Sequence, residues 1–237
     1  MFYFVSKRKI TGILSIVLGI CALLYCGVSN QKQISKAVSA ASLSEKIIAI
    51  DPGHGGFDAG ASANGIQEKD INLSVALSLK QLIEQGGGIA ILTREEDVST
   101  APENKEGMSA KKADLYARKN LAETSDADVF VSIHMNKFPQ SQYKGAQVFY
   151  ANQPETSMRL GEEMQAALIE VLADGNTRKA KKTDGSIFIL KDTTVPSVIV
   201  ECGFLSNPQE AELLKQEDYQ KKLAEAIFAG LIRFFNS

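Results

Sequence analysis

The stretch from Lys46 to Ala61 constrains the fold more than any other part of the chain. It opens with a short apolar run rich in β-branched residues, Ile47 to Ile50, which predicts a buried strand. The run stops at Asp51 and continues as Pro-Gly-His-Gly-Gly. Proline cannot donate to a sheet ladder and glycine permits unusual backbone conformations, so His54 is expected on a tight turn past the carboxyl end of the strand. In open α/β sheets, ligands bind at that edge.

Strand-like and helix-like segments alternate through the rest of the chain. Short apolar runs predict further strands over 89–93, 128–133, 145–150, 187–190 and 197–200, with the one at 145–150 at an edge. Apolar residues at helical spacing predict helices over 68–85, 109–123, 156–172, 208–214 and 218–235. This alternation indicates an α/β fold, a single domain with a mostly parallel, twisted sheet of about six strands and helices on both faces. The carboxyl ends of parallel strands meet at one edge, so we expect the functional site there.

The first 45 residues have a different character. A basic Lys7-Arg8-Lys9 group precedes residues 10–28, which carry no charge. As a helix, this span would extend about 28 Å, close to the apolar thickness of a bilayer. We therefore expect residues 1–28 to be a signal-anchor or a signal peptide, residues 29–45 a polar tether, and residues 46–237 the folded domain. An uncleaved anchor and cleavage after Ala40 both fit the pattern, and the leading positive charge places the domain outside the membrane.

Charge divides the chain in the same place. No acidic residue precedes Glu45, and the first 40 residues hold five basic ones. Of 26 basic residues, 21 remain beyond that point against 28 acidic ones, a net charge of −7. A domain with this balance lacks the basic excess typical of nucleic-acid-binding proteins, so we expect no nucleic-acid partner.

Only two histidines occur, His54 and His134, and each follows an apolar run. Glu201 also follows such a run, and Glu68 opens the first predicted helix. A parallel sheet brings its strand ends together, so these four side chains are expected to converge. Two imidazoles and a carboxylate form a three-ligand zinc set with a position left for water. A further residue must accept a proton from that water, and Glu201, whose pKa would rise on partial burial, is placed for it.

Each of these residues also has a plainer interpretation. A histidine in a glycine-rich turn is often only a turn residue, and a glutamate at a helix start is favourable with the helix dipole alone. A passive role is harder to assign to Glu201, because acidic residues are rarely placed against buried strands. The spacing by itself therefore leaves a zinc hydrolase and a purely structural set both open.

Five sequence blocks resemble, in the same order, the zinc N-acetylmuramoyl-L-alanine amidases of bacterial cell walls. The blocks are Ile50-Asp51-Pro52-Gly53-His54-Gly55-Gly56, Glu68-Lys69-Asp70-Ile71-Asn72-Leu73, Thr93-Arg94, Val131-Ser132-Ile133-His134-Met135-Asn136 and Val200-Glu201-Cys202-Gly203-Phe204-Leu205-Ser206-Asn207. The resemblance covers residues 46–235. It implies one zinc ion held by His54, Glu68 and His134, with Glu201 as the catalytic carboxylate. It also implies hydrolysis of the amide that joins the lactyl group of muramic acid to L-alanine in peptidoglycan.

The resemblance narrows to the germination-specific amidases of spore-forming bacteria, the CwlD type. Its basis is a short chain with an N-terminal apolar segment, no appended wall-binding repeat, and the runs 145–147, 177–181 and 188–191. This implies action on spore cortex, as a step toward the muramic-δ-lactam needed for germination, together with a muramic acid deacetylase. It also implies an exported domain, membrane-anchored or secreted, in the space between the mother-cell and forespore membranes. An activating sporulation lipoprotein is a candidate partner.

Five more residues carry expectations of their own. Arg94, Arg118 and Asn136 are expected to bind substrate, and Arg94, which ends a predicted strand at the same edge, would meet a substrate carboxylate. An ion pair within the protein is the alternative role for Arg94. Asp51 and Asn72 are expected to orient the metal ligands through hydrogen bonds, with a simple turn or helix role as the alternative.

Other functions stay open at this point. A general vegetative wall amidase (an autolysin) would carry the same residues, and another zinc hydrolase of the wall would cut a different bond. A non-catalytic, membrane-anchored wall-binding protein would need no proton acceptor, so Glu201 argues against it. The basic segment 178–182 would face either the anionic peptidoglycan or solvent.

Overall fold

The computed structural model describes residues 43–63, 65–104 and 107–237. The expected membrane segment (1–28) and most of the expected tether (29–45) lie outside the described residues. Among the helices of the described part, none is long and apolar enough to cross a membrane. The elements in chain order are β1 (Ile47–Pro52), β2 (Ser62–Ala63), β3 (Ile66–Gln67), α2 (Glu68–Gln85), β4 (Ile89–Leu92), α3 (Ala110–Thr124), β5 (Val129–Asn136), β6 (Gln147–Tyr150), α4 (Thr156–Leu172), β7 (Lys181–Lys182), the 3-10 helix η1 (Phe188–Leu190), β8 (Ser197–Phe204), α5 (Pro208–Leu214) and α6 (Glu217–Asn236).

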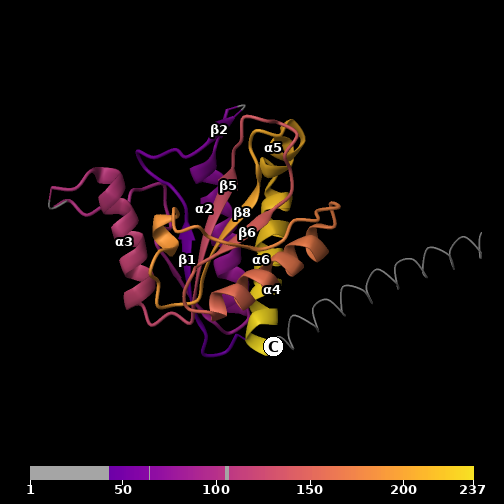
Figure 1. Ribbon diagram of the computed structural model, residues 1–237. Coiled ribbons are helices and arrows are strands. Elements are labelled where there is room, and N and C mark those ends of the chain that lie inside the picture. Colours follow the sequence, from indigo (N-terminus) through magenta and orange to yellow (C-terminus); the bar gives the residue numbers. More distant parts are fainter. Residues whose placement is uncertain (1–42, 64, 105–106) are drawn as a thin grey trace, which may run out of the picture. The chain divides into compact units, whose positions relative to one another are not determined.

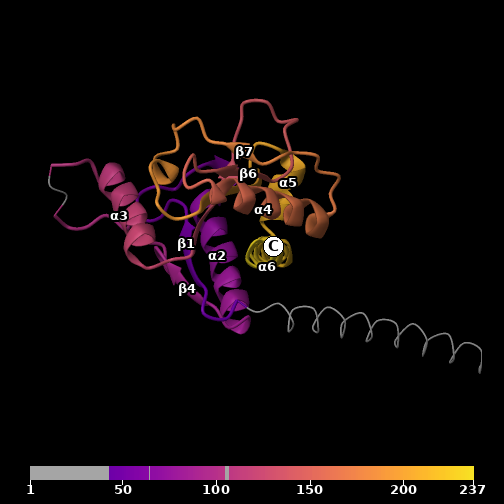
Figure 2. The same ribbon diagram turned by 60° about the horizontal axis from the view of Figure 1, so that its bottom comes forward.

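Six strands form the central sheet, in the spatial order β4-β1-β5-β8-β6-β7. Figure 1 labels the four inner strands of this sheet, and Figure 2 labels β4 and β7 at its edges. Strands β4, β1, β5 and β8 pair in parallel, whereas β6 is antiparallel to β8. The expectation of an α/β domain with a mostly parallel sheet is therefore confirmed. The segment at 145–150 was wrongly expected at an edge, because β7, inside the basic segment 178–182, pairs with β6 and takes the edge position.

Helices cover both faces of the sheet. Figure 2 shows α2, α6 and α4 together on one side, and α6 contacts both of the others. Helix α3 and η1 pack against each other on the opposite face. The alternation of strand side chains supplies both layers, since Ile48 and Ile50 enter the larger core under α2 while Ala49 enters the smaller one beside η1. Burial on both faces explains why these strands read as continuous apolar runs.

Two predictions of secondary structure differ from what is observed. Strands β5 and β8 continue to Asn136 and Phe204, so His134 and Glu201 lie within strands and not after them. The reason is that backbone pairing between β5 and β8 continues through both residues although the apolar pattern stops. Residues 187–190 were expected to form a strand, but Phe188–Leu190 make η1, in which Ile189 and Leu190 are buried beside α3 without pairing to the sheet.

The folded part begins slightly before Lys46. Leu43 is fully buried, and its backbone N–H donates to the carbonyl of Gly86, 2.9 Å away at the end of α2. Residues 43–45, which the sequence assigns to the tether, therefore belong to the packed unit that carries β1.

Candidate active site

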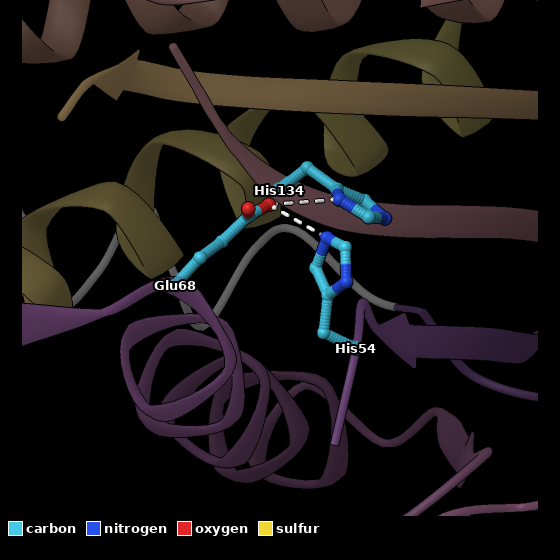
Figure 3. Close-up of side chains that lie close together, drawn as sticks. All are labelled: His54, Glu68 and His134. Carbon is cyan, nitrogen blue, oxygen red and sulfur yellow. Dashed lines mark hydrogen bonds and ion pairs between the residues drawn. The ribbon is translucent and has the colours of Figure 1, made fainter. Parts of the chain in front are cut away.

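Three ligand-type side chains converge at the carboxyl edge of the sheet. His54 lies on the turn after β1, Glu68 is the first residue of α2, and His134 lies near the end of β5. Figure 3 shows both imidazoles directed at the Glu68 carboxylate. Oε1 of Glu68 lies 2.9 Å from Nδ1 of His134 and 3.2 Å from Nε2 of His54. The sequence therefore identified three residues that the fold brings together, with one donor atom of each within 4.8 Å of the others.

This donor set fits a zinc ion. Two imidazole nitrogens and one carboxylate oxygen are a ligand set of catalytic zinc sites. Backbone N–H groups fix the carboxylate, since Ala61 donates to Oε2 of Glu68 at 2.7 Å and Met135 donates to Oε1 at 3.0 Å. Burial raises the pKa of Glu68, but hydrogen bonds and charge from His134 and His54 outweigh it, so the pKa lies far below its usual value. Glu68 therefore stays ionised, as a metal ligand must.

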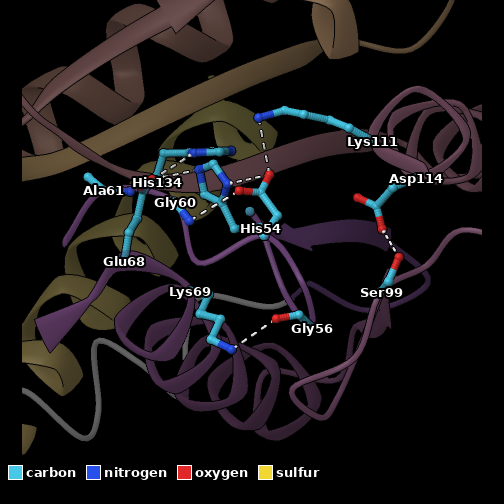
Figure 4. A network of polar contacts seen from close by, with 12 residues as sticks. His54, Gly56, Gly60, Ala61, Glu68, Lys69, Ser99, Lys111, Asp114 and His134 are labelled. Carbon is cyan, nitrogen blue, oxygen red and sulfur yellow. Dashed lines mark hydrogen bonds and ion pairs between the residues drawn. The ribbon is translucent and has the colours of Figure 1, made fainter. Parts of the chain in front are cut away.

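Asp58 orients His54, a role that the sequence pattern did not predict. Its Oδ2 lies 3.0 Å from Nδ1 of His54, which places the ring proton on Nδ1 and leaves the lone pair of Nε2 turned toward Glu68. Lys111 reaches the same oxygen from α3, at 3.3 Å (Figure 4). The sequence does place an aspartate four residues after the histidine in the same glycine-rich turn. That pattern does not predict an orienting role, because aspartate is common in turns, where its side chain hydrogen-bonds the nearby backbone.

The backbone of His54 is strained and is clamped by two buried arginines. Its φ of 62° lies in the left-handed region, which costs a non-glycine residue on the order of 1 kcal/mol. The His54 carbonyl accepts hydrogen bonds from Nε of Arg94 at 2.7 Å and from Nη2 of Arg118 at 2.6 Å. Both arginines also donate to the carbonyl of Pro52. These bonds hold the turn in the conformation that presents the imidazole.

The expectation that Arg94 and Arg118 bind substrate is contradicted by this geometry. The two residues are only 4% and 2% exposed. Arg94 donates to backbone carbonyls around the His54 turn, and Arg118 pairs at 2.7 Å with both Asp51 and Asp114. Because their donors face the protein interior, both arginines position the turn that carries His54. The ion-pair alternative stated for Arg94 is also not what the described residues show, since its hydrogen bonds all go to backbone carbonyls.

Asp51 and Asn72 act on the same turn, and their hydrogen bonds within the described part of the chain go to groups other than the imidazoles. Asp51 is fully buried and accepts hydrogen bonds at 2.7 Å from Arg118 and from two neighbouring hydroxyl groups. Burial raises its pKa, but the charge of Arg118 and these hydrogen bonds outweigh it, so the pKa lies below its usual value. Asn72 donates to the carbonyl of Gly53 at 3.0 Å. Any orienting effect on His54 therefore passes through Arg118 and the backbone.

Two glycines allow the cluster to form. A Cβ added to Gly53 would lie 2.2 Å from Nε2 of His134, and one added to Gly60 would lie 2.6 Å from Oε2 of Glu68. Side chains cannot approach Cβ atoms so closely. The backbone on either side of His54 therefore has to be glycine where it passes His134 and Glu68.

Glu201 stands beside the cluster on the neighbouring strand. It pairs in register with His134, and residues in register share a face of the sheet. Its Oε2 is buried and has no hydrogen-bond partner in the described part of the chain. Burial raises the pKa of Glu201 to about 7, with the charge of Glu68 adding to the rise and that of His134 opposing it. A carboxylate of this kind is suited to take up and return a proton near neutrality.

Asn136 follows His134 by two residues on β5, so it faces the same way, and it is half-buried. Its contact with substrate stays a prediction. A cavity of about 60 Å³ adjoins both imidazoles, and Lys111, Leu115 and Ile189 are among the residues that line it. Helix α3 and η1 thus close one side of the site.

Comparisons with known proteins identify one family that the chain resembles over most of its length. The family model described as N-acetylmuramoyl-L-alanine amidase matches residues 48–233. The germination-specific N-acetylmuramoyl-L-alanine amidase of Bacillus subtilis is 41% identical over 194 residues, which is 81% of this chain and 81% of that protein. The structure of the CwlD amidase from Clostridioides difficile in complex with the GerS lipoprotein matches with a TM-score of 0.77 and 43% identity, over 81% of this chain and 99% of that one. The N-acetylmuramoyl-L-alanine amidase from Clostridium difficile 630 matches with a TM-score of 0.71 and 29% identity, over 82% and 98% of the two chains.

Proposed function

This chain belongs to the N-acetylmuramoyl-L-alanine amidase family, and on that premise we propose that it cleaves peptidoglycan with one zinc ion bound by His54, Glu68 and His134. The bond is the amide between N-acetylmuramic acid and L-alanine. The observation that carries the proposal is the His54–Glu68–His134 cluster with Glu201 in register beside it. Family membership indicates which bond is cut. The geometry supports a set of metal donors with a separate proton acceptor.

Each residue of the site has a separate role in the proposed reaction. When bound, the zinc would supply Lewis acidity, which polarises the substrate carbonyl and makes a water molecule more acidic. Glu201 accepts the proton of the attacking water and passes it to the L-alanine nitrogen, so the C–N bond breaks and a neutral amine leaves. Asp58 keeps Nε2 of His54 unprotonated, and the Arg94–Arg118 clamp holds the His54 turn against Glu68.

One experiment tests metal and bond together. Purified protein is assayed for bound metal and for the products released from isolated peptidoglycan. We expect about one zinc per chain, and mass spectrometry should show peptides with a free L-alanine amino terminus beside peptide-free glycan. Products cut inside the peptide would assign another wall hydrolase. Zinc binding without any release would indicate a wall-binding protein.

The cellular role that we propose is in the spore cortex. Support comes from the 41% identity to a germination-specific relative and the 43% identity to the CwlD amidase. In this role the enzyme strips peptides from muramic acid, a deacetylase then acts on the exposed sugar, and muramic-δ-lactam forms as the mark needed for germination. Spores that lack the protein should contain no muramic-δ-lactam. Persistence of the lactam would instead leave a vegetative wall amidase.

A lipoprotein partner and an exported location complete the proposal. The matched CwlD structure contains the GerS lipoprotein, which supports a partner of that kind for this chain. Co-purification from sporulating cells, followed by zinc titration with and without the partner, tests whether the partner raises metal affinity. The location between the mother-cell and forespore membranes, with residues 1–28 as anchor, is tested by fractionation of sporulating cells with antibody to the folded domain.

A further inference from the structure

A row of polar side chains crosses the sheet from the His54–Glu68–His134 cluster toward the basic segment 178–182. Residues His134, Glu201 and Gln147 are in register on β5, β8 and β6, so all three share one face. The row ends at Arg178, whose Nη1 donates to Oε1 of Gln147 at 2.9 Å. Strand β6 therefore separates Arg178 from β8, the strand that carries the proposed proton acceptor Glu201.

The guanidinium of Arg178 is held in a fixed orientation. Its Nε donates to the carbonyl of Lys144 at 2.8 Å, and its plane lies over the ring of Phe204, 4.8 Å from the centroid. Gln147 is itself fixed, since it is 3% exposed and its Nε2 donates to the carbonyl of Lys179 at 2.9 Å. An arginine that is already oriented loses little conformational freedom when it binds a ligand.

Arg178 still has hydrogen-bonding capacity to offer. Within the described residues no carboxylate lies at ion-pair distance from it and its Nη2 makes no hydrogen bond, whereas the buried Arg118 pairs with two carboxylates. The nearby carboxylate of Glu210 is occupied by two backbone N–H groups. Arg178 is half-buried and borders a cleft of about 430 Å³, so a ligand can reach it. Free guanidinium donors in this setting suit a carboxylate.

The distance between Arg178 and Glu201 fits the position of a carboxylate on the peptide that leaves. Gln147 is the direct cross-strand neighbour of Glu201, and the guanidinium of Arg178 is hydrogen-bonded to the end of the Gln147 side chain, so the guanidinium lies roughly 10 Å from Glu201. A carboxylate bound at about 3 Å from the guanidinium would then lie about 7 Å from the point of cleavage. An extended peptide advances about 3.3–3.6 Å per residue. The distance therefore corresponds to the second residue of the stem, the peptide attached to muramic acid. This residue is a glutamate linked through its side chain, and its α-carboxyl group is either free or amidated.

We propose that Arg178 binds the free α-carboxylate of the second stem residue and so makes the enzyme selective for non-amidated peptidoglycan. The inference rests on the proposed function, since it takes Glu201 as the point of cleavage. Gln147 is a positioning residue that holds the guanidinium toward the substrate. The contact exists before and during the reaction, so its loss should appear mainly as a higher KM.

Two muramoyl tripeptides that differ only in a free α-carboxylate or an α-carboxamide on the second residue test this assignment. The wild-type enzyme should show a kcat/KM about 10- to 100-fold higher on the carboxylate substrate. Arg178→Met should lose that preference by slowing only on the carboxylate substrate, and Arg178→Lys should restore part of it. Lys181→Met removes the same charge from an exposed site in the same segment, and it should keep the full preference.

Three results would overturn the inference. Equal turnover of both substrates by the wild-type enzyme would show that the carboxylate is not recognised. An equal loss on both substrates in Arg178→Met would show a role in folding only, and a loss of preference in Lys181→Met would show a general charge effect. Failure of the proposed function is distinguishable from these, because then the wild-type enzyme would release no peptide from either substrate.

Discussion

Nδ1 of His54 lies 3.0 Å from Oδ2 of Asp58, four residues further along the same turn. This contact decides which imidazole nitrogen is available to a metal. A carboxylate that accepts the other ring proton fixes the tautomer of a ligating histidine and raises its basicity. Asp58 is in turn placed by its own hydrogen bond from the backbone N–H of Gly60, at 3.2 Å.

Asp58→Asn should weaken zinc binding about 10- to 100-fold while the fold stays intact. The amide is uncharged and accepts the Nδ1 proton less well, so Nε2 of His54 is presented less reliably. Competition with a chromogenic chelator measures the affinity, and circular dichroism checks the fold. Asp70→Asn removes the same charge from an exposed position on α2 and should bind zinc like the wild type. Wild-type affinity in Asp58→Asn would refute the orienting role.

Arg118→Met should destabilise the protein by about 3–5 kcal/mol, because it leaves the buried carboxylates of Asp51 and Asp114 without their partner. It also removes one of the two donors that hold the His54 carbonyl. Urea unfolding measures the free energy. The control is Arg233→Met, whose exposed pair with Glu170 is expected to contribute less than about 1 kcal/mol. Similar losses in both variants would contradict the clamp.

Acid should destabilise the protein through Asp51. The pKa of Asp51 is lowered in the folded state, so its ionised form contributes stability that is present above the unfolded value of about 3.9 and is lost as the pH falls through the folded pKa. Asp51→Asn lacks this contribution. The stability gap between wild type and variant, measured by urea unfolding with chelator present throughout, should be widest near pH 7 and shrink below about pH 4. A gap independent of pH would contradict the assignment.

Much of the fold was readable because buried parallel strands and amphipathic helices leave direct patterns. The ranges predicted for α2 and α4 coincide with those observed. The 187–190 segment failed because a short apolar run looks alike in a strand and in a buried 3-10 turn, and packing against α3 decided between them. The extension of β5 past His134 was hidden because polar side chains interrupt the apolar pattern while the backbone ladder continues.

Site residues could be predicted from the sequence only where the residue type has few common roles in proteins. Two histidines and a glutamate at strand and helix ends point to convergence, because parallel topology places those ends together. The roles of Arg94 and Arg118 could not be read in this way. An arginine near a strand end looks the same whether it faces solvent or the carbonyls of a turn 40 or 64 residues away. Only the three-dimensional position of the His54 carbonyl separates these roles.

Glu201→Gln should retain zinc and lower kcat by about 10²- to 10⁴-fold, because the amide cannot accept the water proton. Metal content and peptide release are measured on the same sample, with the exposed Glu225→Gln as control. The base works only when ionised, so the wild-type kcat/KM should rise with pH. The midpoint should lie at or below about 7, since a bound cation favours the carboxylate. Full turnover in Glu201→Gln would remove it from the mechanism.

Gly53→Ala should abolish tight zinc binding although it adds only one methyl group. The new Cβ would lie 2.2 Å from Nε2 of His134, so the imidazole has to leave its position beside Glu68. Gly203→Ala is the matched control, because its nearest neighbours would lie at 3.4 Å, an ordinary van der Waals distance. Chelator competition on both variants gives the comparison. If Gly53→Ala binds zinc as tightly as Gly203→Ala, the His134 ring is not confined by the backbone after β1, and the close packing of the proposed ligands does not set metal affinity.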